Sequence, residues 1–181
     1  PRFALGGLSM GGYIALEIMR QAPERVMKLA LLDTSARPDT PEQIEARRLL
    51  MDRVRDGELE AVIAQVTPNL LHPDHRNDRN LIDIQVRMGR DVSPEGFIRQ
   101  EAAITGRIDS RPHLAAIKVP TLVLVGDRED LTPPDRSEET AAAILAARPV
   151  IVQKCGHAST LEQPQAVTQA LTEWLSLCPS S

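Results

Sequence analysis

The sequence predicts an α/β protein in which a mostly parallel sheet is flanked by helices and interrupted by a helical insertion. Two short apolar runs, Phe3 to Leu5 and Val26 to Leu32, enclose a helix-like segment from Tyr13 to Arg20. A strand, helix and strand of this size indicate parallel strands joined by a right-handed crossover. Another apolar run, Thr121 to Val125, follows only after a long stretch of polar and helical sequence. The two ends of the chain therefore build the predicted sheet.

The chain divides into three predicted parts. Residues 1–37 hold a core strand, a tight turn, a helix and a strand; residues 38–118 form a helical cap insertion; residues 119–181 hold the remaining core strands and helices. Prolines separate the amphipathic segments of the insertion. We expect the insertion to roof the ligand site, because ligand sites prefer such clefts.

Periodicity and helix-end signals predict the individual elements. Helices are expected at residues 41–55, 58–65, 79–90, 94–105, 135–147 and 163–177, and a last short strand at residues 150–153. Ser93 is predicted to cap the helix that begins at Pro94. Trp174 is expected on the apolar face of the last helix, and the tail at residues 179–181 is expected to fray.

The turn after the first strand carries the candidate nucleophile, Ser9. Gly7-Leu8-Ser9-Met10-Gly11 has the form G-x-S-x-G between a strand and a helix. Gly7 and Gly11 are expected where the two backbones nearly touch. The turn would present the Ser9 hydroxyl and leave the Met10 backbone N–H free to hold an oxyanion. A glycine-rich turn without chemistry is the structural alternative.

A serine needs a base to take its proton, and near neutral pH that base is usually histidine. His157 follows a predicted strand and lies between Gly156 and Ala158, which lets its ring swing over the sheet edge. The other histidines, His72, His75 and His113, are interpreted as surface or helix-capping residues. His72 and His75 lack further ligands at recognisable spacing, so no metal site is predicted.

The histidine in turn needs a carboxylate to fix its tautomer. Glu129 and Asp130 both lie in the loop after the Thr121 to Val125 strand, and Asp33 ends the Val26 to Leu32 strand. Asp127 is closer to its strand and is expected to cap a turn. The residues themselves leave the choice of acid open.

Composition excludes several classes of partner. Hydrophobic residues make up 42% and charged residues 25% of 181, and the formal net charge is −4. Because Lys and Arg form no basic patch, nucleic acid is not an expected partner. No apolar run reaches the length of a membrane span, so a cytoplasmic protein is expected. Cys155 and Cys178 are expected to be reduced, Cys155 as a packing residue.

From Phe3 to its end the chain resembles the α/β-hydrolase superfamily, in particular its bacterial esterases and lactonases. The matching pieces are Gly7-Leu8-Ser9-Met10-Gly11-Gly12, Ala22-Pro23-Glu24-Arg25-Val26, Leu32-Asp33-Thr34, Pro120-Thr121-Leu122-Val123-Leu124-Val125-Gly126, Thr132-Pro133-Pro134, Cys155-Gly156-His157 and Glu162-Gln163-Pro164. Serine, acid and histidine also follow one another in the order of that family. The family register of the acid falls on Glu129, with Asp130 one place later.

The resemblance also implies that the family's N-terminal part is missing. Related proteins begin with further strands and helices, including a loop that gives a second oxyanion N–H. The strand before Ser9 would then be an exposed apolar edge. We therefore expect this edge to pair with a missing N-terminal half or with a second copy of the chain.

Two functions follow from these patterns. The first is a serine hydrolase that cleaves small-molecule carboxylic esters or lactones through an acyl-enzyme, without cofactor or metal. Resemblance also leaves open lyases, carbon–carbon bond hydrolases and cofactor-free peroxidases. The second is a noncatalytic, truncated hydrolase-fold chain that serves as an assembly or binding module.

Overall fold

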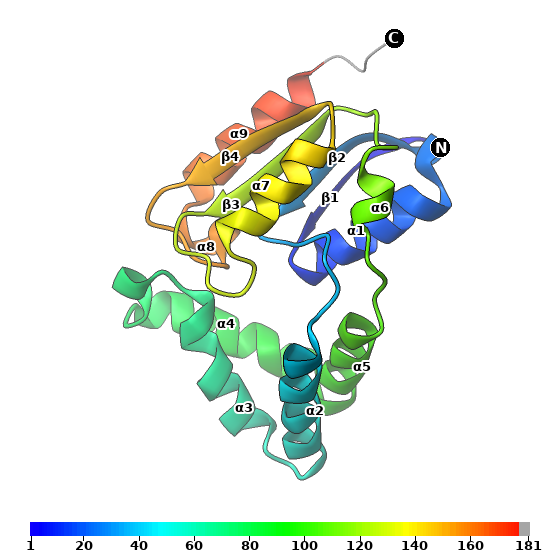
Figure 1. Cartoon of the computed structure of the whole chain (residues 1–181). Coiled ribbons are helices and arrows are strands. Elements are labelled where there is room, and N and C mark those ends of the chain that lie inside the picture. Colours follow the sequence, from blue (N-terminus) through cyan, green and yellow to red (C-terminus); the bar gives the residue numbers. More distant parts are fainter. Residues whose placement is uncertain (178–181) are drawn as a thin grey trace.

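A computed structural model describes residues 1–177 of the chain, so Cys178 and the predicted tail lie outside the described residues. Its four strands form one parallel sheet in the order β1-β2-β3-β4 (Figure 1). The strands are β1 (Phe3–Leu8), β2 (Val26–Leu32), β3 (Thr121–Gly126) and β4 (Ala147–Val152). The predicted fold class, an α/β protein with a parallel sheet and flanking helices, is confirmed.

Helices occupy most of the remaining described chain. Those that flank the sheet are α1 (Met10–Gln21), η1 (Pro23–Arg25), α6 (Arg111–Leu114), α7 (Pro134–Ala143), α8 (Ser159–Glu162) and α9 (Pro164–Ser176). Those between β2 and α6 are α2 (Pro41–Arg55), α3 (Leu59–Val66), η2 (Thr67–Leu70), η3 (Pro73–His75), α4 (Arg79–Asp91) and α5 (Pro94–Thr105). Residues 41–105 are called the cap below.

The two faces of the sheet bury separate apolar clusters. Alternation along β2 sends Leu29 and Leu31 to one face, where they pack with α1, α6 and α7. Ala30 and Leu32 face the other way and pack with α9, including Trp174. Trp174 is buried as expected, and its Nε1 donates to the Pro120 carbonyl at 3.1 Å. Helices on both faces are what a parallel sheet requires.

All four strands end at the same edge of the sheet. Leu8 is in register with Leu32, Leu32 with Leu124, and Gly126 with Val152. The segments that leave this edge carry Ser9, Asp33, Glu129 and His157. The parallel topology therefore gathers residues that are far apart in the sequence.

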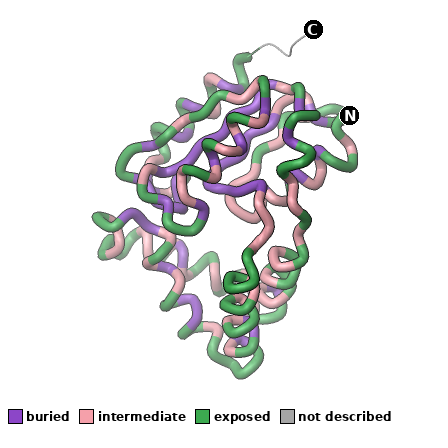
Figure 2. The backbone as a smooth tube through the Cα atoms, viewed as in Figure 1, coloured by how far each residue is buried: buried purple, intermediate pink, exposed green. Residues whose placement is uncertain are grey.

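The cap lies beyond this same edge of the sheet (Figure 1). Among the strands, β2 and β3 hold most of the buried residues, whereas α2 is mostly exposed (Figure 2). The cap also contacts the segment that follows β4, because the Ala158 N–H donates to the Leu70 carbonyl at 3.0 Å. Within the described residues, no helix is long and apolar enough to cross a membrane.

The cap helices match the predictions within one residue, and the predicted N-cap Ser93 accepts from the Gly96 N–H. The chain between α7 and β4 differs from the prediction. The helix expected through residue 147 ends at Ala143, and the strand expected from residue 150 begins at Ala147. Buried Ile144 lies between the two elements and joins the core, so packing ends the helix where alanine content alone would continue it.

Candidate active site

Ser9 stands at the sharp turn between β1 and α1 with a positive φ of 53° and a ψ of −119°. The turn is fixed from both sides. The Ser9 N–H donates to the Leu32 carbonyl at 2.9 Å, and the Thr34 hydroxyl donates to the Ser9 carbonyl at 2.8 Å. Although Ser9 is the N-cap residue of α1, its side chain does not cap the helix. The hydroxyl is therefore not consumed by the local fold.

Only one of the two glycines of the predicted motif is required for close backbone approach. A Cβ at Gly7 would lie 2.1 Å from the Gly11 carbonyl oxygen. The two backbones do nearly touch at Gly7 and Gly11, but a Cβ at Gly11 would meet nothing within 4 Å, so the expectation that Gly11 must lack a side chain is wrong. The second crowded position is Gly12, where a Cβ would lie 2.4 Å from the Thr34 hydroxyl.

Met10 is the first residue of α1. The first N–H groups of a helix have no partner within the helix, and the helix dipole favours negative charge there. The Met10 N–H is therefore a suitable donor to an anion beside Ser9.

His157 lies in the loop between β4 and α8 and is buried, with 6% of its surface exposed. Its Nδ1 forms a hydrogen bond with Oε2 of Glu129. The other Glu129 oxygen accepts from the N–H groups of Leu131 at 2.6 Å and Thr132 at 3.1 Å. Because the side chain of Glu129 is fully buried and bonded at both oxygens, it holds the histidine ring in one orientation.

The environment shifts the pKa of His157 in two directions. Burial lowers the pKa, whereas the hydrogen bond and negative charge of Glu129 raise it. The net result is a pKa above the ordinary value of 6.5. The pair thus stabilises the imidazolium that forms when this histidine accepts a proton.

The structure does not bring the other two candidate acids to Nδ1 of His157. Oδ2 of Asp130 lies 2.8 Å from Nη2 of Arg76, and the Asp130 side chain is 61% exposed. Asp130 belongs to a solvated ion pair because the loop turns the preceding residue, Glu129, inward. Asp33 is buried, and its Oδ1 accepts from the Gly126 N–H at 3.0 Å.

Asp33 is nevertheless a charged neighbour of the pair formed by His157 and Glu129. Burial raises the pKa of Asp33 to about 7, against the lowering effects of Ser159, His157 and the Gly126 N–H. Within residues 1–177, Oδ2 of Asp33 makes no hydrogen bond of normal geometry. The Ser159 hydroxyl is nevertheless near enough to lower the pKa of Asp33. Near neutral pH, Asp33 is therefore partly protonated.

The remaining candidates have structural roles. Asp127 accepts from the Cys155 N–H at 3.0 Å, which agrees with the predicted turn cap. Cys155 is buried and free, and burial raises the pKa of its thiol. Of the two predicted roles for His72, surface residue or helix cap, the structure shows the cap of η3, with the residue buried at 8% exposure. No metal-binding group of three or more ligands occurs among the described residues.

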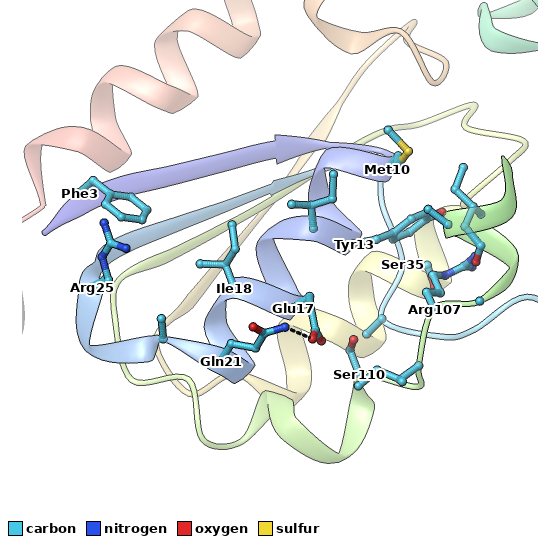
Figure 3. Close-up of a pocket in the computed structure, with 17 residues that line it drawn as sticks. Phe3, Met10, Tyr13, Glu17, Ile18, Gln21, Arg25, Ser35, Arg107 and Ser110 are labelled. Carbon is cyan, nitrogen blue, oxygen red and sulfur yellow. Dashed lines mark hydrogen bonds between the residues drawn. The ribbon is translucent and has the colours of Figure 1, made fainter. Parts of the chain in front are cut away.

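A cavity of about 540 Å³ runs along α1 (Figure 3). Met10, Tyr13 and Arg107 lie toward one end of it, and Phe3 and Arg25 lie at the other. The guanidinium of Arg107 stacks 4.2 Å from the centre of the Tyr13 ring. Ser9, Glu129 and His157 are not on the cavity wall. Of the candidate site, the cavity therefore reaches Met10 but none of the three reactive side chains.

Sequence reasoning missed two supporting residues. Thr34 holds the Ser9 carbonyl, and Glu162 accepts from the Gly156 N–H at 2.8 Å beside His157. The available signals were a hydroxyl directly after a buried strand and an acidic residue in an otherwise uncharged segment after His157.

Comparison with known proteins identifies the family of this chain. Residues 1–164 match the family described as the alpha/beta hydrolase fold. A pimeloyl-[acyl-carrier protein] methyl ester esterase of Neisseria meningitidis is 30% identical over an alignment of 168 residues that covers 88% of this chain and 64% of the relative.

Two solved structures are also similar. A thermophilic esterase from Thermogutta terrifontis, with malate bound, is 38% identical with a TM-score of 0.91, covering 96% of this chain and 64% of its own. An enol-lactonase from Burkholderia xenovorans LB400 is 28% identical with a TM-score of 0.87, and the match covers 97% of this chain and 66% of the enol-lactonase. This chain thus spans about two thirds of the length of these relatives, and it belongs to the α/β-hydrolase fold family.

Proposed function

We propose that this chain carries the reactive residues of a serine hydrolase that cleaves carboxylic esters or lactones. The observation that carries the proposal is the buried hydrogen bond between Glu129 and Nδ1 of His157. It orients the ring so that Nε2 is left to act as a base. Relatives named as an ester esterase and an enol-lactonase support the substrate class.

In the proposed reaction, the Ser9 oxygen attacks the substrate carbonyl carbon while Nε2 of His157 takes the hydroxyl proton. The carbonyl oxygen becomes an oxyanion, which the Met10 N–H binds. When the tetrahedral intermediate collapses, His157 returns the proton to the leaving alcohol. For a lactone, the alcohol remains tethered to the acyl group.

Water completes the turnover. His157 deprotonates a water molecule as it attacks the acyl-enzyme carbonyl, and the proton then passes to the Ser9 oxygen as the acid product leaves. Glu129 keeps its hydrogen bond to Nδ1 of His157 and stabilises each imidazolium. No step consumes a redox equivalent.

Hydrolysis of p-nitrophenyl acetate tests this function. Ser9→Ala should lower kcat/KM about 1,000-fold or more, since the nucleophile is removed. Ser176→Ala is the matched control, because Ser176 lies in α9 and, within residues 1–177, its hydroxyl donates to the Glu173 carbonyl alone. Equal rates for wild type and Ser9→Ala would refute the proposal and favour the noncatalytic module.

A further inference from the structure

One buried carboxylate joins the cap to the loop that carries His157. Glu162 ends α8, and its side chain is fully buried. Oε1 accepts from the Gly156 N–H at 2.8 Å, and Oε2 accepts from the His72 N–H at 2.7 Å. Nδ1 of His75 lies 2.8 Å from the same Oε2. The Glu162 oxygen is the acceptor of this hydrogen bond, as it is for the His72 N–H, and Nδ1 of His75 is the donor.

The two backbones approach each other closely at the same place. A Cβ at Gly156 would lie 2.5 Å from the His72 nitrogen and 2.7 Å from the Leu71 carbonyl carbon. On the other side of His157, the Ala158 N–H donates to the Leu70 carbonyl. The cap therefore contacts the loop at the residue immediately before His157 and at the residue immediately after it.

Other contacts hold these segments independently of Glu162. The Cys155 N–H is bonded to Asp127, and Nδ1 of His72 accepts from the Asp74 N–H at 3.1 Å. The loop and the cap thus keep some of their local structure when the Glu162 contacts are weakened. What the Glu162 contacts add is a rigid link between the two segments.

We propose that Glu162 is a positioning residue for His157 and that His75, on the cap, acts through it. One oxygen of this carboxylate fixes the residue before His157, and the other fixes the cap. Placement of His157 therefore depends on whether the cap is docked. The inference rests on the proposed function, since it treats His157 as the base, but its structural part can be measured without catalysis.

Hydrogen–deuterium exchange of the full chain, followed by mass spectrometry, tests the link. His75→Ala should raise the exchange rate of residues 155–162 about tenfold, although His75 itself lies in the cap. His75→Asn should restore slow exchange, because the Asn amide nitrogen takes the place of Nδ1 and can donate to Glu162. His113→Ala, which changes a histidine of α6, is the control and should leave these residues unchanged.

Glu162→Gln should raise exchange in both residues 68–76 and residues 155–162. If this variant does not fold, His75→Ala still tests the link. The His75 side chain is one-quarter exposed and lies outside both apolar clusters, so its loss should leave the protein folded. Unchanged exchange of residues 155–162 in His75→Ala would overturn the inference.

The rate of covalent labelling by a fluorophosphonate supplies the functional readout. His75→Ala should label about tenfold more slowly than wild type at saturating reagent, and His75→Asn should recover most of the rate. An unchanged labelling rate in His75→Ala would contradict the positioning role of Glu162 and His75 but not the proposed hydrolase function. Failure of the wild type to label would contradict the proposed function in this chain, and the exchange experiment would still decide whether the cap controls the loop.

Discussion

The backbone of Ser9 adopts a conformation that non-glycine residues rarely use, with φ at 53°. Such a conformation costs on the order of 1–3 kcal/mol and persists only where its surroundings enforce it. Two hydrogen bonds enforce it here. The Ser9 N–H donates to the Leu32 carbonyl, and the Thr34 hydroxyl donates to the Ser9 carbonyl. The strain coincides with the residue that we propose as the nucleophile.

Substitution of each carboxylate in turn should show whether Glu129 or its neighbour Asp130 is the acid that pairs with His157. Glu129→Gln should lower kcat for ester hydrolysis by about 1,000-fold or more, because the charge that stabilises the imidazolium is lost. It should also move the pH midpoint of activity downward, since burial of His157 still lowers its pKa while the negative charge of Glu129, which raises that pKa, is removed. Asp130→Asn, which changes only the exposed partner of Arg76, is the control and should stay within about threefold of wild type. Equal losses in the two variants would contradict the assignment.

Asp33 should make folding stability depend on pH. Its pKa is about 7 in the folded state against 3.8 in the reference state, so the folded protein binds this proton more tightly. Asp33 therefore contributes most to the free energy of unfolding below pH 3.8, where it is protonated in both states. This contribution, on the order of 4 kcal/mol, is lost as the pH rises to about 7.

Asp33→Asn removes this loss and keeps the acceptor for the Gly126 N–H. Urea unfolding at pH 5 and pH 8 should therefore show the variant gaining stability over wild type as pH rises. Asp56→Asn, at an exposed position, is the control. A stability difference between Asp33→Asn and wild type that does not change with pH would show that Asp33 is ionised throughout.

At the scale of elements, the junction of β1 and α1 offers a matched pair of glycine variants. Gly7→Ala should destabilise the fold by about 3 kcal/mol or more, because its Cβ would overlap the backbone of Gly11. Gly11→Ala should be neutral or stabilising by up to about 1 kcal/mol, since its Cβ meets open space within a helix. Urea unfolding midpoints give the comparison. Similar losses in both variants would mean that the junction is crowded on both sides.

Elements with local signals were predictable from the sequence. Helix α2 begins where expected because Thr40 and Gln43 form a reciprocal capping box just before a polar, helix-forming run. The boundary between α7 and β4 was not predictable, because burial of Ile144 in the core decides it. The bond between Glu162 and the His72 N–H joins residues 90 positions apart, and no local pattern reports such a contact.

At the scale of the whole molecule, the parallel topology explains why the site could be anticipated at all. A serine after one strand and a histidine after another must leave the same edge of the sheet, so their sequence order was sufficient to predict Ser9 and His157 as neighbours of that edge. The choice among Glu129, Asp130 and Asp33 needed the side-chain directions, because all three lie at the same edge. Only the folded loop distinguishes the buried carboxylate from the solvated one.

The sheet has β1 at one edge, and the outer side of β1 is unpaired within the described residues. Unpaired strand edges with apolar neighbours favour association with another chain. We therefore expect the 181-residue chain to self-associate, as measured by size-exclusion chromatography with light scattering. Ala4→Lys, which places a charge at an exposed position of β1, should shift the population toward monomer. A stable wild-type monomer would contradict this expectation.

Whether Ser9 and His157 form an activated pair is tested most simply by intact mass after exposure to a fluorophosphonate. One covalent adduct is expected on the wild-type chain, and none on Ser9→Ala or His157→Ala. A folded wild-type protein that gains no adduct, or an adduct that persists in Ser9→Ala, would contradict the activation of this pair.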